Sequence, residues 1–273
     1  MRLTSENIEI FYNKVESFII QQADLYGLSE NDLKEYYHCK PECDITKGAP
    51  LYSIYKRLLG SLQNRQGLPN IIKFWHKDYE SIYQETLFAF DPQKVHKKYN
   101  GMNGAERLFE DLNKKVHWNA EHYELPKQWC EGAIGAAKVL SEYRDSKSLY
   151  EVLMKQAENG DLMRIADYWD KLPIKGMGFA LSCDFLKEIG IDLPKPDVHI
   201  IAVIKEVFFP GKDISEKELT AAFINMVKML KEKHPEMTAY KLDKMIWLIC
   251  TGNFYLHSAA PKTMRDCLIA KIN

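Results

Sequence analysis

Apolar residues recur at spacings of three and four along almost the whole of this 273-residue chain, which is the period of one helix face. Residues 6–22 show the pattern with Ile8, Phe11, Val15, Phe18 and Ile19. A similar stripe runs through residues 50–62, and small residues line residues 127–143. Sustained alternation of apolar and polar residues is absent, so we expect an all-α fold.

Composition is that of an ordinary globular protein. Hydrophobic residues make up 46% and charged residues 27%, and the length suits one large domain or two small lobes. No apolar run approaches the roughly 18 residues that cross a bilayer, and residues 1–18 lack the apolar core of a signal peptide. We therefore expect an intracellular protein with no membrane association.

Cysteine spacing and charge limit the kinds of binding site. The six cysteines lie at positions 39, 43, 130, 183, 250 and 267, without a Cys-x2-Cys pair, so buried free thiols are expected rather than zinc ligands or disulfides. The clustered C-terminal cysteines of an iron–sulfur protein are missing, and no side-chain metal site is expected. The net charge of −1 means that any DNA binding would depend on local groups.

The stretch DYWDKLPIKGMGFALSCDFLKEIG, residues 167–190, predicts a helix, a tight turn and a second helix. Gly176 and Gly178 permit positive φ angles and close approach of another backbone. The second helix would present free N–H groups, which can seat a phosphate. The same glycines also suit an ordinary αα-corner. The second helix carries an apolar face made of Phe179, Cys183, Leu186 and Ile189.

The stretch LPKPDVHIIAVIKEVFF, residues 193–209, leads through a stiff proline pair to Asp197 and then into a helix. Aspartate is a favoured N-cap, and the helix dipole favours its ionised form. Asp197 is therefore either a helix cap alone or also a fixed carboxylate with a chemical task. The helix is expected to turn inward Val198, Ile201, Ile204 and Phe208.

The Gly-x-Gly hairpin with an aspartate 21 positions after Gly176 resembles the helix-hairpin-helix (HhH-GPD) DNA glycosylase superfamily. The residues IKGMG…FL…IG…D-x-H-I are most similar to its 8-oxoguanine glycosylase/lyase branch. The resemblance implies a two-lobed helical fold with the active-site cleft between the lobes. It implies a glycosylase core over residues 50–255, with the hairpin at 172–190 and an insertion at about 85–125. Residues 1–49 would form an N-terminal helical extension, and residues 256–273 would pack on the N-terminal lobe.

The resemblance also implies roles for particular residues. Gly176, Met177 and Gly178, with Lys175 beside them, would bind a DNA phosphate, and the hairpin carbonyls could hold a monovalent cation as the one cofactor. Asp197 would be the catalytic carboxylate, which stabilises an oxocarbenium-like sugar and activates water. His199 would contact the DNA backbone. Candidates for the pocket of a flipped base, which could equally be core residues, are Phe179, Trp247, Asn253 and Tyr255.

One departure from the lyase branch changes the expected chemistry. That branch has a nucleophilic lysine two positions after the second hairpin glycine, where this chain has Ala180. Lys175 and Lys195 are nearby but do not match the motif. We therefore expect a monomeric, monofunctional base-excision-repair DNA N-glycosylase that hydrolyses the N-glycosidic bond of a damaged or mispaired base in double-stranded DNA, without AP lyase activity. The alternatives are a non-catalytic DNA-binding protein, a bifunctional glycosylase/lyase with a displaced lysine, and a helical interaction protein unrelated to DNA.

Overall fold

The computed structural model describes residues 1–25, 27, 29, 31, 41, 43–65, 67–251 and 264–272. Across these residues all regular secondary structure is helical, which confirms the all-α prediction. The chain divides into two compact units. Unit 1 combines Met1–Lys40 with Asp192–Asn273, and unit 2 is the continuous segment Pro41–Ile191. The division falls between Ile191 and Asp192, so the hairpin belongs to unit 2 and Asp197 to unit 1.

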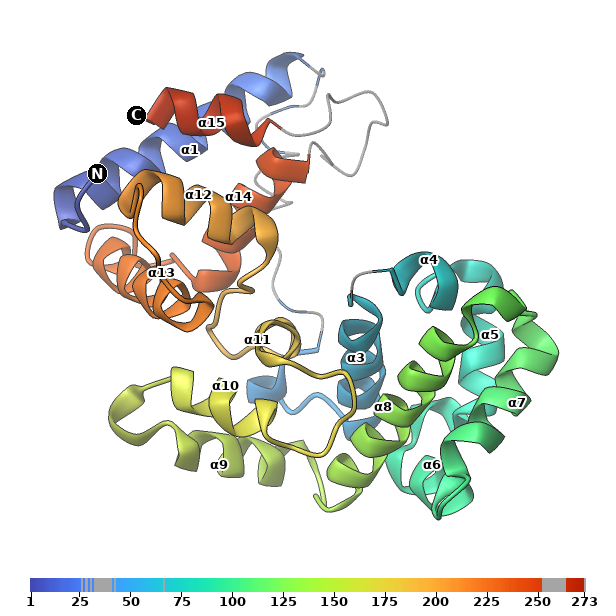
Figure 1. The fold of residues 1–273 in the computed structure, drawn as a ribbon. Coiled ribbons are helices and arrows are strands. Elements are labelled where there is room, and N and C mark those ends of the chain that lie inside the picture. The colour runs from blue at the N-terminus through green and yellow to red at the C-terminus, as the bar shows by residue number, and fades with distance from the viewer. Residues whose placement is uncertain are drawn as a thin grey trace. The chain divides into compact units, whose positions relative to one another are not determined.

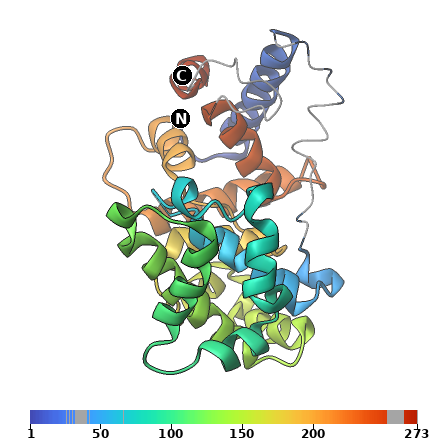
Figure 2. The same cartoon turned by 90° about the vertical axis from the view of Figure 1, so that its right-hand side faces the viewer.

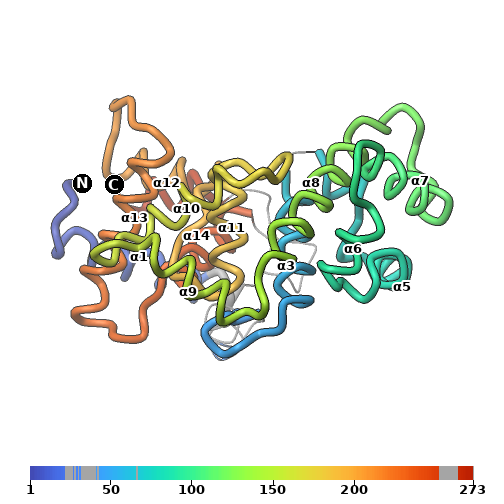
Figure 3. Tube along the Cα trace, turned by 90° about the horizontal axis from the view of Figure 1, so that it is seen from below, coloured from blue at the N-terminus to red at the C-terminus, as the bar shows by residue number. Residues whose placement is uncertain are grey.

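Unit 2 is organised around one long helix, α8 (Glu124–Ser141), which packs against α3 (Leu51–Gln63), α6 (Pro92–Tyr99) and α7 (Gly104–Val116). α3 lies between α8 and α11 (Phe179–Glu188), as Figures 1 and 3 show. The remaining α-helices of this unit are α4 (Pro69–Ile72), α5 (Lys77–Thr86), α9 (Ser146–Gln156) and α10 (Met163–Asp170). Short 3-10 helices occur at Ile45–Lys47, Phe88–Phe90, Ala120–His122 and Glu158–Gly160.

Aromatic side chains form much of the core of unit 2. The ring of Phe74 packs against Tyr83, Phe90 and Trp129 with centroids 5.1 to 5.8 Å apart. The buried indole N–H of Trp129 donates to the carbonyl of Leu59 at 3.3 Å. Aromatic side chains bury large areas, so this cluster is a major source of the stability of the unit.

Residues 85–125, expected as an insertion, are largely helical in the structure. They contribute α6 and α7, and both helices pack on α8. In Figure 2 the blue-green to green helices of this region face the viewer. The segment is therefore part of the packed body of unit 2, and its description as an insertion stays a prediction.

Unit 1 joins the two ends of the chain around one apolar core. It consists of α1 (Ser5–Leu25), α12 (Val198–Phe208), α13 (Glu216–Lys231), α14 (Ala239–Thr251) and α15 (Arg265–Ile272). α1 packs against α13, α14 and α15. The predicted capping box of α13 is confirmed, because Ser215 Oγ accepts from Glu218 N and the Glu218 carboxylate accepts from Ser215 N. These compact units do not follow the boundaries 1–49, 50–255 and 256–273, which stay a prediction.

The inward face expected for α12 is confirmed at Ile204 and Phe208, which are buried, and Ile201 is partly buried against the core, but the expectation is wrong at Val198. Val198 is 71% exposed, because it is the first residue after the N-cap and lies on the outer side of the helix. The stripe that faces the core is spaced i, i+3, i+4, i+7 and i+8. It consists of Ile200, Val203, Ile204, Val207 and Phe208.

Two further expectations can be compared with the described residues. The cysteines that the structure describes are free, with Cys43, Cys130, Cys183 and Cys250 buried and Cys267 exposed. Cys39 lies outside the described residues. Among the helices of the described part of the chain, none has the length and hydrophobicity of a membrane span.

Candidate functional site

The helix–turn–helix predicted from residues 167–190 is confirmed, with α10 before the turn and α11 after it. The turn is made by Ile174, Lys175, Gly176 and Met177, since Met177 N donates to the carbonyl of Ile174 at 3.1 Å. Gly176 occupies the third position of this turn with φ of +81°. A type II turn requires a positive φ at that position, so glycine is needed there for conformational reasons.

The second hairpin glycine has a different role from the one expected. Gly178 is the N-cap of α11 with φ of −95° and ψ of 178°, an extended conformation open to any residue. A Cβ at this position would meet nothing within 4 Å. The absence of a side chain therefore leaves the surface over the helix N-terminus open, where a ligand could approach the backbone.

The hairpin presents two amide groups that form no hydrogen bond within the described part of the chain. Gly176 and Gly178 are exposed, and neither N–H donates to another residue that the structure describes. The Met177 amide, also expected as a phosphate donor, is engaged inside the turn, and the Met177 side chain is buried. Met177 thus shapes the loop from within, while the two glycines provide donors that an anion could use.

The loop is seated on two glycines of α8. A Cβ on Gly132 would lie 2.4 Å from the carbonyl oxygen of Lys175, and one on Gly135 would lie 2.6 Å from that of Pro173. These distances are too short for any side chain, so only glycine allows this approach. The small residues predicted to line residues 127–143 therefore form the seat of the hairpin loop.

A guanidinium that sequence reasoning missed lies beside the turn. Arg65 Nη1 is 3.8 Å from the position that a Cβ would take at Gly176, and it donates to Gln128 Oε1 at 2.7 Å. Lys175, which was predicted, is exposed in the turn itself. The hairpin thus combines open amides with two cationic side chains, a combination suited to a phosphate. In the sequence, Arg65 is recognisable only as a basic residue that follows the helix at residues 50–62, and nothing there indicates that it lies beside Gly176.

In unit 1, Asp197 caps α12 as predicted. Its Oδ1 accepts hydrogen bonds from the backbone N–H groups of His199 and Ile200 at 2.9 and 3.0 Å. Its Oδ2 accepts no hydrogen bond from a residue that the structure describes, and the side chain is only partly buried. The carboxylate is therefore held by one oxygen and keeps the other available.

The charge of Asp197 reaches helix α14. Burial raises the pKa of the Cys250 thiol to about 12, and the negative charge of Asp197 adds to the increase. Cys250 is accordingly a neutral thiol at neutral pH and does not compete as a nucleophile near this carboxylate.

The proline segment before Asp197 is anchored to α14. The buried Asp243 carboxylate accepts a 2.6 Å hydrogen bond from Lys195 N through Oδ2. Asp192 accepts from Ala239 N at 2.6 Å and pairs with Lys231 Nζ at 2.6 Å. Two carboxylates therefore fix the chain on the approach to Asp197, a role not predicted for either of them.

The other predicted site residues are distributed as follows. His199 is partly buried, and its Nδ1 is buried without a hydrogen-bond partner among the described residues. Phe179 is buried in unit 2, whereas Trp247 is partly exposed on α14 with Lys244 Nζ 5.4 Å from its ring centroid. Their roles stay predictions. Asn253 and Tyr255 lie outside the described residues.

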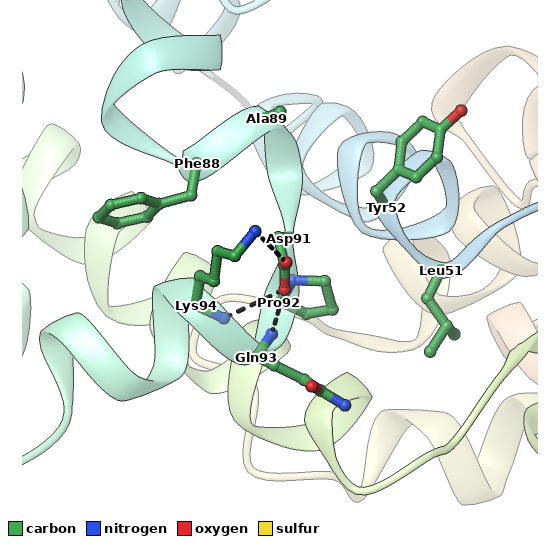
Figure 4. A pocket seen from close by; sticks show the side chains of 8 residues that line it. All are labelled: Leu51, Tyr52, Phe88, Ala89, Asp91, Pro92, Gln93 and Lys94. Atoms are coloured by element: carbon green, nitrogen blue, oxygen red, sulfur yellow. Dashed lines mark hydrogen bonds and ion pairs between the residues drawn. The ribbon is translucent and has the colours of Figure 1, made fainter.

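A hollow of about 340 Å³ occurs on unit 2 next to the start of α6 (Figure 4). Its one carboxylate, Asp91, accepts hydrogen bonds from the backbone N–H groups of Gln93 and Lys94 at 3.1 Å each and pairs with Lys94 Nζ. Burial raises the pKa of the Asp91 carboxyl, but these bonds and the lysine charge outweigh it, so the pKa falls below its ordinary value. Its lining residues include no second carboxylate, histidine or cysteine, so we assign this hollow no catalytic role.

Comparisons of the chain with protein-family models, with curated proteins and with solved structures found no match. The resemblance to the DNA glycosylases therefore rests on the residues of the hairpin and of the Asp197 segment alone.

Proposed function

We propose that the protein is a monofunctional DNA N-glycosylase that removes a damaged or mispaired base from double-stranded DNA. The observation that carries this proposal is the hydrogen bonding of the Asp197 carboxylate. One carboxylate oxygen is fixed by two amides of α12, while the other accepts no hydrogen bond from the described residues. A helix cap needs only the first oxygen, and the second is the one that could act on a substrate.

The chemistry requires a fixed negative charge beside a sugar. A glycosylase extrudes its target nucleotide from the duplex because the reacting bond is inaccessible in the stack. Breaking the bond between the sugar and the base builds positive charge on the sugar ring. The Asp197 carboxylate would stabilise that charge and would orient or deprotonate the attacking water. The Asp192 and Asp243 contacts would keep the carboxylate in position.

The hairpin would bind the phosphates of the DNA backbone. The Gly176 and Gly178 amides are open to an anion, and Arg65 and Lys175 add positive charge at the same turn. Such contacts position the nucleic acid without reading its sequence. They support phosphate binding by this unit, while the identity of the excised base would depend on other residues.

Water is the proposed nucleophile, because the position of the lyase lysine holds Ala180. This residue is in the first turn of α11, and its methyl side chain offers no amine for a Schiff base. The expected product is an intact strand with an abasic site. A covalent complex trapped by borohydride would instead favour the bifunctional alternative, and peptide mapping would identify the lysine.

The test compares wild type with Asp197→Asn on duplexes that carry oxidised, alkylated or deaminated bases. Asparagine also caps helices, so the variant should keep its fold while losing the charge. We expect base release by wild type and a loss of at least about 100-fold in the variant. Asp145→Asn, which changes the N-cap carboxylate of α9, is the matched control and should retain activity.

Two results would overturn the proposal in different ways. If wild type releases no base from any duplex but binds an abasic-site analogue with strong salt dependence, the protein is a non-catalytic DNA binder. If Asp197→Asn releases bases as fast as wild type, Asp197 is a helix cap and has no part in the reaction.

A further inference from the structure

A second hollow, of about 460 Å³, lies on unit 2 where α3 ends and α4 and α5 begin. It contains no residue of the hairpin and none of the residues predicted from the sequence. Its lining combines an indole, an imidazole, two carboxamides, a proline and an ammonium group. These belong to Gln63, Pro69, Asn70, Lys73, Trp75 and His76.

Trp75 gives the hollow an aromatic surface that is held in place. The side chain is 45% exposed, yet its indole lies directly on the backbone of α3. A Cβ on Gly60 would lie only 2.1 Å from the indole Cζ2, so this seat exists because position 60 is glycine. The charges of Lys56 and Arg57 lie 5.8 and 5.3 Å from a ring centroid of Trp75. The ring is thus both ordered and accessible.

Gln63 places an unused donor in the wall of the hollow. The side chain is 5% exposed, and its Oε1 accepts a 2.6 Å hydrogen bond from Phe74 N. That bond fixes the orientation of the amide. Its Nε2 donates to no residue that the structure describes, and it is not sealed from solvent. Because buried polar groups are normally hydrogen-bonded, an amide whose oxygen is engaged and whose NH2 group is not is expected to donate to an acceptor on a ligand.

Lys73 adds a positive charge at the same hollow. Its ammonium group forms no ion pair within the described part of the chain, although it lies 5.7 Å from the ring centroid of Tyr79. The neighbouring cations Lys56 and Arg57 are paired with Glu80 and Glu188. Of these three cations, Lys73 is the one without an ion pair among the described residues, so its charge is available to an anionic ligand.

We propose that this hollow binds a nucleotide. The base stacks on Trp75, a ring acceptor receives the Gln63 Nε2 hydrogen, and the phosphate pairs with Lys73. Stacking of a base on an aromatic side chain tolerates any base, because every base has a π-face. The same chemistry is offered by a free mononucleotide and by an unpaired base in a DNA strand. The inference does not depend on the glycosylase activity.

The first experiment measures binding of AMP by isothermal titration calorimetry, with ribose 5-phosphate as the ligand that lacks a base. We expect AMP to bind and ribose 5-phosphate not to bind. Trp75→Ala should weaken AMP binding by at least about fivefold. Tyr52→Ala is the matched control, since Tyr52 is an exposed aromatic residue of α3 that does not line the hollow, and it should bind AMP as wild type does.

A second variant keeps the proposal testable if Trp75→Ala does not fold. Lys73→Met keeps the length of the side chain and removes its charge, so it should weaken AMP binding while leaving adenosine binding unchanged. Circular dichroism melts establish that each variant is folded. The proposal would be overturned if wild type bound neither AMP nor adenosine. It would also be overturned if Trp75→Ala and Lys73→Met were both folded and bound AMP as tightly as wild type.

The two sources of the nucleotide are separated with DNA. Fluorescence anisotropy compares a duplex that has one unpaired adenine with the fully paired duplex. A preference for the unpaired adenine that Trp75→Ala abolishes assigns the hollow to strand binding. AMP binding without that preference assigns it to a free nucleotide. The AMP and adenosine measurements involve none of the residues assigned to base release, so a failure of the glycosylase proposal is distinguishable from a failure of this one.

Discussion

The buried carboxylate of Asp243 accepts a 2.6 Å hydrogen bond from the backbone N–H of Lys195, two residues before Asp197. Helix α14 thereby holds the start of α12 through the main chain rather than through the Asp197 side chain. Since Pro194 and Pro196 on either side of Lys195 have no N–H, this is the one backbone donor between Leu193 and Asp197. The position of Asp197 therefore depends on Asp243, which lies 48 positions after Lys195 in the chain.

Replacement of Asp243 by alanine should destabilise unit 1. The Lys195 N–H would lose its acceptor in a partly buried setting, which costs about 1–3 kcal/mol. Unfolding in urea should show a lower midpoint. The control is Asp266→Ala, which removes an exposed carboxylate of α15 and should leave the midpoint unchanged. Equal midpoints for the two variants would show that the hydrogen bond from Lys195 N to Asp243 does not stabilise unit 1.

Alanine at Gly135 should distort the hairpin. Its Cβ would lie 2.6 Å from the Pro173 carbonyl oxygen, so the loop must move, at a cost of about 1–3 kcal/mol. Hydrogen exchange at the loop amides should accelerate, and DNA affinity should fall with it. Lys138→Ala, an exposed position on the same helix, is the control. Normal exchange rates in Gly135→Ala would show that the loop does not depend on this seat.

Removal of the Arg65 charge should weaken DNA binding and reduce its salt dependence. A guanidinium that contacts one phosphate contributes about one unit to the slope of log affinity against log salt. Arg65→Ala should therefore lower the slope by about one, measured by anisotropy over a salt series. Lys155→Ala removes an exposed charge on α9 and should not change the slope. An unchanged slope in Arg65→Ala would remove this residue from the interface.

Alkaline pH should destabilise unit 1 through Cys250. Burial, with the charge of Asp197, raises the thiol pKa from its ordinary value of 9.0 to about 12 in the folded protein. The stabilising contribution is therefore complete below pH 9.0 and is lost as the pH rises toward 12. Because one proton is released on unfolding in this window, the free energy of unfolding should fall by about 1.4 kcal/mol per pH unit.

Thermal melts of wild type and Cys250→Ala across this window measure the effect. Wild type should lose stability more steeply than the variant, because only wild type has this thiol to ionise on unfolding. Cys267→Ala, at an exposed thiol, should follow wild type. Parallel curves for wild type and Cys250→Ala would show that Cys250 titrates normally in the fold.

The local geometry of the hairpin turn and of the helix caps could be predicted from the sequence because these elements are formed by near neighbours. The Gly176 turn, the Asp197 cap and the Ser215 capping box each depend on residues within four positions. The inward face of α12 was predicted correctly at Ile204 and Phe208 but wrongly at Val198, because every residue at the start of the helix is apolar except His199. With so little polar contrast, the sequence pattern does not select one face, and packing against the unit 1 core decides it.

The sequence by itself determined the helices, their caps and the tight hairpin turn, since backbone conformation and hydrogen bonds between near neighbours control these features. Only the tertiary structure decided that Gly132 and Gly135 receive the hairpin loop, that Arg65 lies beside Gly176 and that Trp75 rests on Gly60. Those contacts join segments separated along the chain. They arise from the shapes of packed side chains, which no spacing rule in the sequence encodes.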